Sequence, residues 1–165
     1  MRSWTRAIVI GAAGFALAAP AVSQRADGQL EPRSVELQRQ AKALYSAGKF
    51  EAAEDLLETA LAVDPRNRWA YIDLARVADR QRLFGKAIKM TNKALALDPN
   101  DADAIAVQGE AMVELGAVAR AQANLQKLQS ICGRMACPQI AQLSAAISRG
   151  PSVASANTPP EPKTN

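Results

Sequence analysis

A short sequence that ends in Asp-Pro and two further polar residues occurs twice in this chain, and it restricts the fold more than any other feature. "ALAVDPRN" ends at Asn67 and "ALALDPND" ends at Asp101, so the two copies lie 34 residues apart. Each copy closes a stretch with the periodicity of an amphipathic helix. Proline lacks the amide hydrogen that continues a helix, so Pro65 and Pro99 each predict a helix end. A period of this length is typical of stacked units that cannot bury their apolar faces alone.

The spacing divides the middle of the chain into three frames, residues 34–67, 68–101 and 102–135. Small residues recur where two antiparallel helices would approach closely, and large apolar residues recur beside them. The small residues are Ala41, Ala75 and Gly109 at frame position 8, and Ala53, Ala87 and Ala121 at position 20. The large ones at position 17 are Phe50, Phe84 and Val118. Each frame therefore predicts a helical hairpin.

The ends of these helices are also marked in the sequence. Gly48 and Gly116 stand where the first helix of a frame must turn into the second, whereas Arg82 occupies that position in the middle frame. Asn67 and Asp101 are suited to cap the helix that follows each Asp-Pro. The third frame lacks the proline.

With this period and these positions, the chain resembles the tetratricopeptide repeat family, whose helix-turn-helix unit has the same length. The resemblance covers Ser34 to about Ile131. It implies an all-α fold in which three tetratricopeptide helix-turn-helix repeats stack as a short right-handed solenoid over residues 34–149. A C-terminal capping helix is expected at 138–148, where Ile140, Leu143 and Ile147 share one face. The alternative is an alanine-rich helical bundle without true repeats.

The N-terminal segment has the order of an export signal. A basic start is followed by thirteen apolar residues at 7–19 and by small residues at Ala21 and Ser23. A membrane anchor would require about 20 apolar residues. We therefore expect residues 1–23 to be a signal peptide cleaved after Ser23, with Ala21 as the alternative site. The mature chain would be periplasmic or secreted, without stable membrane insertion.

Composition then excludes several functions. Cleavage after Ser23 removes Arg2 and Arg6 and leaves 18 Lys and Arg against 16 Asp and Glu, a net charge of only +2. This small charge predicts no nucleic-acid partner. Histidine is absent, which removes His-based catalysis and most metal sites. We expect no enzyme activity, no catalytic residue, no metal and no cofactor. The flanking segments 24–33 and 150–165 are polar or rich in Pro, Ser and Asn, and are expected to be disordered.

Two cysteines flank the predicted turn into the capping helix. Cys132 and Cys137 are the only cysteines of the chain. In an exported protein a structural disulfide is the leading interpretation, worth about 2 kcal/mol for so short a loop. Redox-active pairs are more often two residues apart, and two thiolates without histidine are too few for a closed metal site.

The first helix of each repeat lines the concave groove in tetratricopeptide proteins, so the resemblance places candidate partner-binding residues there. Tyr45 and Trp69 are the two aromatic residues of the mature chain without a packing position in the repeat. The full set is Lys42, Tyr45, Trp69, Ile72, Arg76, Arg80 and Glu110. Family members that clamp a C-terminal carboxylate use Lys, Asn and Arg at set groove positions. Only Lys42 and Arg76 could serve here, and Glu110 replaces a basic residue, so such a clamp is not predicted.

These observations predict a non-enzymatic protein-protein interaction module that holds a protein or peptide segment, such as a periplasmic adaptor or assembly factor. An alternative interpretation of the groove charges is a solvated helix face with internal ion pairs. A second hypothesis for the protein is a structural subunit of an envelope complex, held by its convex face and tails. A thiol redox protein is a third, weaker hypothesis. The sequence does not identify the partner or the oligomeric state.

Overall fold

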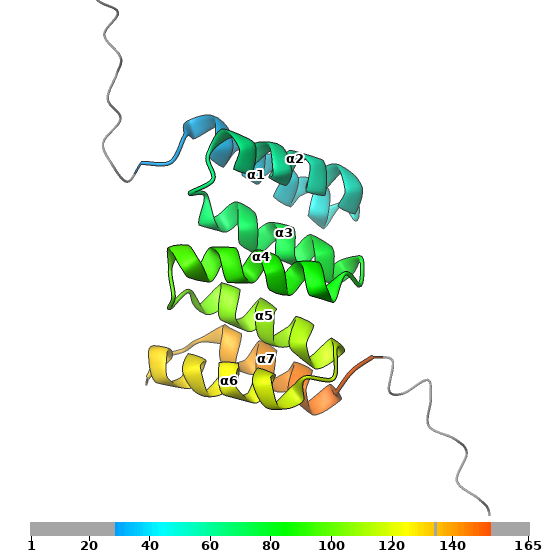
Figure 1. Ribbon diagram of the computed structural model, residues 1–165, viewed down its shortest axis with the longest axis vertical. Coiled ribbons are helices and arrows are strands. Elements are labelled where there is room, and N and C mark those ends of the chain that lie inside the picture. Colours follow the sequence, from blue (N-terminus) through cyan, green and yellow to red (C-terminus); the bar gives the residue numbers. More distant parts are fainter. Residues whose placement is uncertain (1–28, 134, 153–165) are drawn as a thin grey trace, which may run out of the picture.

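The structure is a computed structural model that describes residues 29–133 and 135–152. The described residues form helices and turns and contain no strand, which confirms the all-α prediction. In Figure 1 the stack runs from α1 and α2 at one end to α6 and α7 at the other. They are α1 (Pro32–Ser46), α2 (Phe50–Val63), α3 (Arg68–Arg80), α4 (Phe84–Leu97), α5 (Ala102–Glu114), α6 (Val118–Cys132) and α7 (Pro138–Arg149).

The helices pack as antiparallel pairs, and the pairs stack with a defined curvature. α1 packs on α2, α3 on α4 and α5 on α6. The odd-numbered helices also contact one another in series, from α1 through α3 and α5 to α7, whereas no pair of even-numbered helices makes such contacts in the described chain. The odd-numbered helices are therefore closer together and form the concave side, and the even-numbered helices form the convex side.

Alanines at equivalent repeat positions form the contacts between paired helices. Ala41 and Ala75, and the position 20 alanines Ala53, Ala87 and Ala121, are all fully buried. The residues at position 17, Phe50, Phe84 and Val118, each begin the second helix of a pair, and their side chains are partly buried. Residues 34 apart thus occupy equivalent sites, because the same small side chain permits the same close approach in each pair.

The expected caps and turns are present. The Asn67 side chain accepts a hydrogen bond from the Ala70 amide at 3.2 Å, and that of Asp101 accepts from the Ala104 amide at 2.7 Å. Gly48 and Gly116 have φ of 74° and 76°, and Arg82 adopts the same left-handed conformation with φ of 61°. The turn geometry is therefore kept in the middle repeat although its residue is not glycine.

The capping helix closes the stack. α7 packs against both α5 and α6, and Leu143 is fully buried. A β-carbon on Gly109 would lie 2.6 Å from Leu143 Cδ1, so the approach of α7 to α5 depends on the missing side chain. A disulfide joins Cys132, the last residue of α6, to Cys137, which directly precedes α7, as predicted.

Helix boundaries differ slightly from the expected repeat boundaries. α1 begins at Pro32, ahead of the first frame at Ser34, because proline is favourable in the first turn of a helix. α7 extends to Arg149. None of the described helices is both long and apolar enough to cross a membrane. The expected signal peptide 1–23, residues 24–28 and the tail beyond Ser152 lie outside the described residues.

Candidate binding groove

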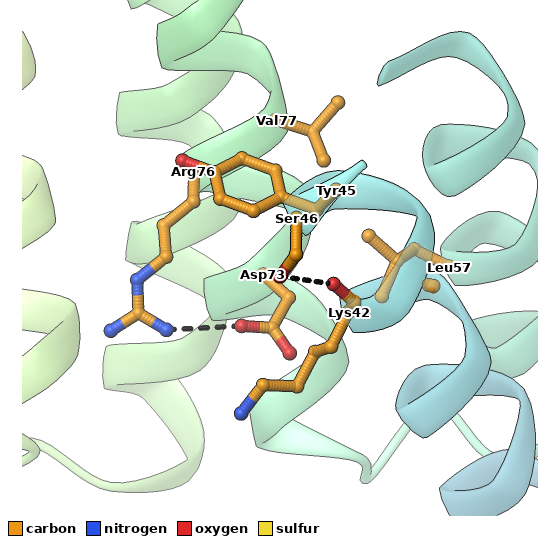
Figure 2. A pocket seen from close by; sticks show the side chains of 8 residues that line it. Lys42, Tyr45, Ser46, Leu57, Asp73, Arg76 and Val77 are labelled. Atoms are coloured by element: carbon orange, nitrogen blue, oxygen red, sulfur yellow. Dashed lines mark hydrogen bonds and ion pairs between the residues drawn. The ribbon is translucent and has the colours of Figure 1, made fainter. Parts of the chain in front are cut away.

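The concave side contains a pocket between α1 and α3. It has a volume of about 210 Å³, and Figure 2 shows the side chains around it. Its apolar walls come from Leu57, Val77, Ala41 and the ring of Tyr45, and its polar rim from Lys42, Ser46, Asp73 and Arg76. An opening of this size and character can hold one apolar side chain of a partner, with polar contacts at the rim.

Two cations beside this pocket are not engaged in ion pairs within the described chain. Lys42 is exposed, and its ammonium group makes no salt bridge to a described residue. The Arg80 guanidinium lies 5.9 Å from the centre of the Tyr45 ring and 5.1 Å from that of Phe50. These rings hold Arg80 in place without neutralising it. Both cations can therefore meet a carboxylate.

A chain of polar side chains crosses the whole concave side. The Arg76 guanidinium donates to Asp73 Oδ1 at 3.0 Å and to Asp103 Oδ1 at 2.9 Å. Gln38 of α1 donates to the other oxygen of Asp73, and Gln139 of α7 donates to Asp103 at 3.3 Å. Side chains of all four concave helices are thus connected. Arg76, one of the predicted partner-binding residues, is already paired with two carboxylates of its own chain.

The C-terminal part of the groove is acidic. Burial, with the charges of Glu110 and Glu114 as further causes, raises the pKa of Asp79 to about 6. Burial also raises the pKa of Glu110, against the hydrogen bond that Gln142 Nε2 donates to it at 3.0 Å and the charges of Arg149 and Arg76. Asp79, Glu110 and Glu114 thus lie together at this end of the groove.

The structure corrects two expectations about the groove. Ile72 was expected among the partner-binding residues, but it is fully buried in the core with Ala75 and Ala104. The first helix of a repeat has a core-facing side as well as a concave one, and Ile72 lies on the former. It therefore cannot contact a partner.

Trp69 and Tyr45 were both expected in the groove, but they lie at opposite ends of α3. Trp69 is in the first turn of α3, whereas Tyr45 contacts Arg80, the last residue of that helix. The length of α3 separates these points by about 17 Å. Trp69 is 43% exposed, and the Arg68 guanidinium lies 4.4 Å from its ring centre. It forms a separate exposed aromatic site, so Tyr45 alone belongs to the pocket.

Sequence reasoning missed the acidic residues that control the groove. Asp73 and Asp103 fix Arg76, and Asp79 lines the acidic end. A usable signal was present for one of them, since Asp73 lies three residues before Arg76 on one helix, the spacing of an intrahelical ion pair. The pairing with Asp103 required the packing of α5 on α3. In the described part of the chain, no group of three or more His, Cys, Asp or Glu side chains could hold a metal ion.

The comparisons with known proteins agree with this geometry. The tetratricopeptide repeat family model matches residues 44–109. This match supports the predicted resemblance to the tetratricopeptide repeat family. The repeat domain is similar in structure to the TPR domain of Sgt2 from Aspergillus fumigatus, with 20% identity, a TM-score of 0.67 and coverage of 82% of this chain and 89% of that one.

Two further similar structures contain bound partners. One is the TPR2B domain of yeast Sti1 in a complex with pHsp70, with 20% identity, a TM-score of 0.66 and coverage of 72% and 98%. The other is the first TPR of Spaghetti (RPAP3) bound to the HSP90 peptide SRMEEVD, with 20% identity, a TM-score of 0.61 and coverage of 70% and 94%. At these identities the likeness establishes the fold alone. No curated protein sequence matches the chain.

Proposed function

We propose that this tetratricopeptide protein is a non-enzymatic adaptor or assembly factor that binds a segment of another protein in its concave groove. The observation that carries the proposal is the pocket between α1 and α3. It combines apolar walls, the accessible ring of Tyr45 and the unpaired cation of Lys42. Such a combination of an apolar cavity with a few directed polar groups is typical of recognition sites.

The charges define what the segment should carry at this end of the groove. An apolar side chain would enter the pocket, and a neighbouring carboxylate would meet Lys42 or Arg80. Arg76 contributes shape and rigidity, because Asp73 and Asp103 already neutralise it. Peptide binding by the similar domains of Spaghetti and Sti1 supports a protein segment as the ligand. Of the two residues that could form the family's clamp for a C-terminal carboxylate, Lys42 and Arg76, Arg76 is already engaged. We therefore do not propose a C-terminal carboxylate as the ligand.

We place this activity in the periplasm or outside the cell. The proposal is supported by the order of charged, apolar and small residues at the start of the sequence, which is that of an export signal. The Cys132–Cys137 disulfide is compatible with it, because disulfides persist in oxidising compartments.

The test compares two variants that change the same kinds of residue on opposite sides of the molecule. Lys42→Glu with Ser46→Trp reverses the free charge and covers the pocket from its rim, where both side chains are exposed. Lys93→Glu with Ala96→Trp makes the matched changes on α4, where both residues border a different, shallow pocket with Leu97. Each chain is exported with a tag, crosslinked in the periplasm and recovered, and the crosslinked partners are identified by mass spectrometry.

Loss of a specific partner from the α1 variant, with retention by the α4 variant, is the expected result. Circular dichroism should show equal helicity in both variants, so that unfolding does not explain the loss. The reverse pattern would favour the structural subunit held by its convex face. Retention of the partner by both variants would remove the groove from the mechanism.

A further inference from the structure

Three carboxylates at the C-terminal part of the groove form no ion pair within the described chain. Asp79 lies near the end of α3, and Glu110 and Glu114 lie on α5. None of them pairs with a described Lys or Arg side chain. The pKa of Asp79 is raised first by burial and then by the charges of Glu110 and Glu114. The three groups therefore act on one another, and together they are the acidic end of the groove.

The acidic end begins directly beside the pocket between α1 and α3. The Arg80 guanidinium lies 5.9 Å from the centre of the Tyr45 ring, which borders that pocket. Arg80 also borders a second cavity, of about 250 Å³, together with Asp79 and Glu114. α3 packs on α5, and the axes of packed helices lie about 8–10 Å apart. A bound chain that left the pocket toward α5 would reach the acidic end within three or four extended residues, about 10–14 Å.

A carboxylate of a bound segment would meet opposite charges at these two places. Beside the pocket, Lys42 and Arg80 are exposed and form no ion pair in the described chain. On α5, Glu110 and Glu114 are only partly buried, so their charges act on a segment that lies over them. Like charges at this range repel one another, and specific interfaces use repulsion as well as attraction to select a ligand.

We propose that the acidic end is a specificity element that acts by repulsion and excludes carboxylates from the α5 side of the pocket. The recognised segment then has one apolar side chain in the pocket and carboxylates on one flank only. Its other flank, which runs over α5, contains no acidic residue. The inference rests on the proposed function, because it describes the ligand of the same groove. A segment that is acidic on both flanks would meet Lys42 with one flank and Glu110 and Glu114 with the other.

Fluorescence anisotropy with capped, dye-labelled peptides tests this selection on the chain expressed with its own N-terminal segment. Each peptide has a central leucine. Two peptides carry two glutamates on one flank and two serines on the other, in either order, so that both chain directions are sampled. A third peptide carries two glutamates on each flank. It should bind about five-fold more weakly than the better one-flank peptide, although its larger negative charge favours Lys42 and Arg80.

A pair of variants separates the acidic end from the overall charge of the protein. Glu110→Gln with Glu114→Gln removes two charges and keeps the shape and an acceptor oxygen of each side chain. The two-flank peptide should then bind at least as tightly as the better one-flank peptide. Glu51→Gln with Asp55→Asn is the matched control, because it removes two exposed carboxylates from α2 on the convex side. It should keep the five-fold difference, and circular dichroism should show equal helicity in both variants.

Salt provides a second readout, because repulsion between partly exposed charges is screened. In about 0.5 M NaCl the difference in the unaltered chain should fall below about two-fold. A difference that is unchanged in salt would assign the selection to shape and overturn the proposal.

Equal affinities of the unaltered chain for one-flank and two-flank peptides would overturn the proposal and leave the groove function intact. So would a difference that persists in Glu110→Gln with Glu114→Gln. If this variant changes only the self-association of the chain, measured by sedimentation velocity, the acidic end is an interface between copies and the proposal is wrong. Binding of none of the peptides would contradict the ligand chemistry of the proposed function and overturn both.

Discussion

The two ends of the concave side differ although the repeat makes them equivalent. Frame position 9 is Lys42 in α1, Arg76 in α3 and Glu110 in α5. Lys42 is exposed beside an open pocket, Arg76 is held by two aspartates, and Glu110 accepts a hydrogen bond from Gln142 of α7. The difference arises from the neighbour that packs next to each helix. The α5 face is covered by the capping helix, and this leaves the α1–α3 end as the open part of the groove.

The largest expected effect comes from breaking the closed end. Gly109→Val would place two methyl groups where a single β-carbon already lies 2.6 Å from Leu143. We expect a loss of about 3 kcal/mol in the free energy of unfolding, measured by urea denaturation. Gly85→Ala on α4 is the control, because a β-carbon there meets no atom within 4 Å. It should gain about 0.5 kcal/mol from helix propensity. Equal effects would mean that α7 does not pack closely on α5.

Removing the disulfide should loosen the same end less severely. Cys132→Ser with Cys137→Ser should cost about 2 kcal/mol, since the bridge closes only a short loop. Hydrogen exchange should increase in α7 while that of α1 and α2 is unchanged. Met135→Ser in the same loop removes a side chain that is 75% exposed and should alter neither quantity. A uniform increase of exchange along the chain would contradict a local role.

Frame position 9 allows the open end of the groove, at Lys42, to be compared with its middle, at Arg76. Arg76→Ala should cost about 1.5 kcal/mol, because it leaves Asp73, only 7% exposed, without its charged partner. Lys42→Ala should change the free energy of unfolding by less than about 0.5 kcal/mol, because the ammonium makes no described contact. Urea denaturation of both variants measures the difference. A costly Lys42→Ala would show that the basic end is structural.

The acidic end predicts the smallest effect, a dependence of stability on pH. The pKa of Asp79 is about 6 in the folded chain, above its ordinary value of 3.8, so the folded state binds the proton more tightly. This stabilisation is complete below the unfolded pKa and is lost as pH rises through about 6. Since Asp79 is only partly buried, we expect the chain to be about 1 kcal/mol less stable at pH 7.5 than at pH 5. Asp79→Asn should reduce this difference, and an unchanged difference would assign it to other groups.

The sequence predicted the repeat units because their determinants are local. Ala53, Ala87 and Ala121 recur where helices must touch, and Asn67 and Asp101 cap helices through amides only three residues away. Such contacts are encoded within one frame and can be read without the rest of the fold. The disulfide could be predicted for the same reason, since its cysteines flank a single turn.

The groove could be predicted only in part. Lys42 and Tyr45, both predicted for the groove, border the pocket between α1 and α3, and Arg80 lies beside the Tyr45 ring. The burial of Ile72 and the separation of Trp69 from Tyr45 could not be read in this way. They depend on the rotation of α3 about its axis and on which end of it faces α1, and one repeat position specifies neither.

The sequence by itself determined the number of hairpins and their boundaries to within a few residues. These follow from side-chain size and helix caps, which act within a frame. Only the tertiary structure decided which charges are free. Pairs such as Arg76 with Asp103, and Glu110 with Gln142, join different frames, and they form only when neighbouring helices bring distant residues within hydrogen-bond distance.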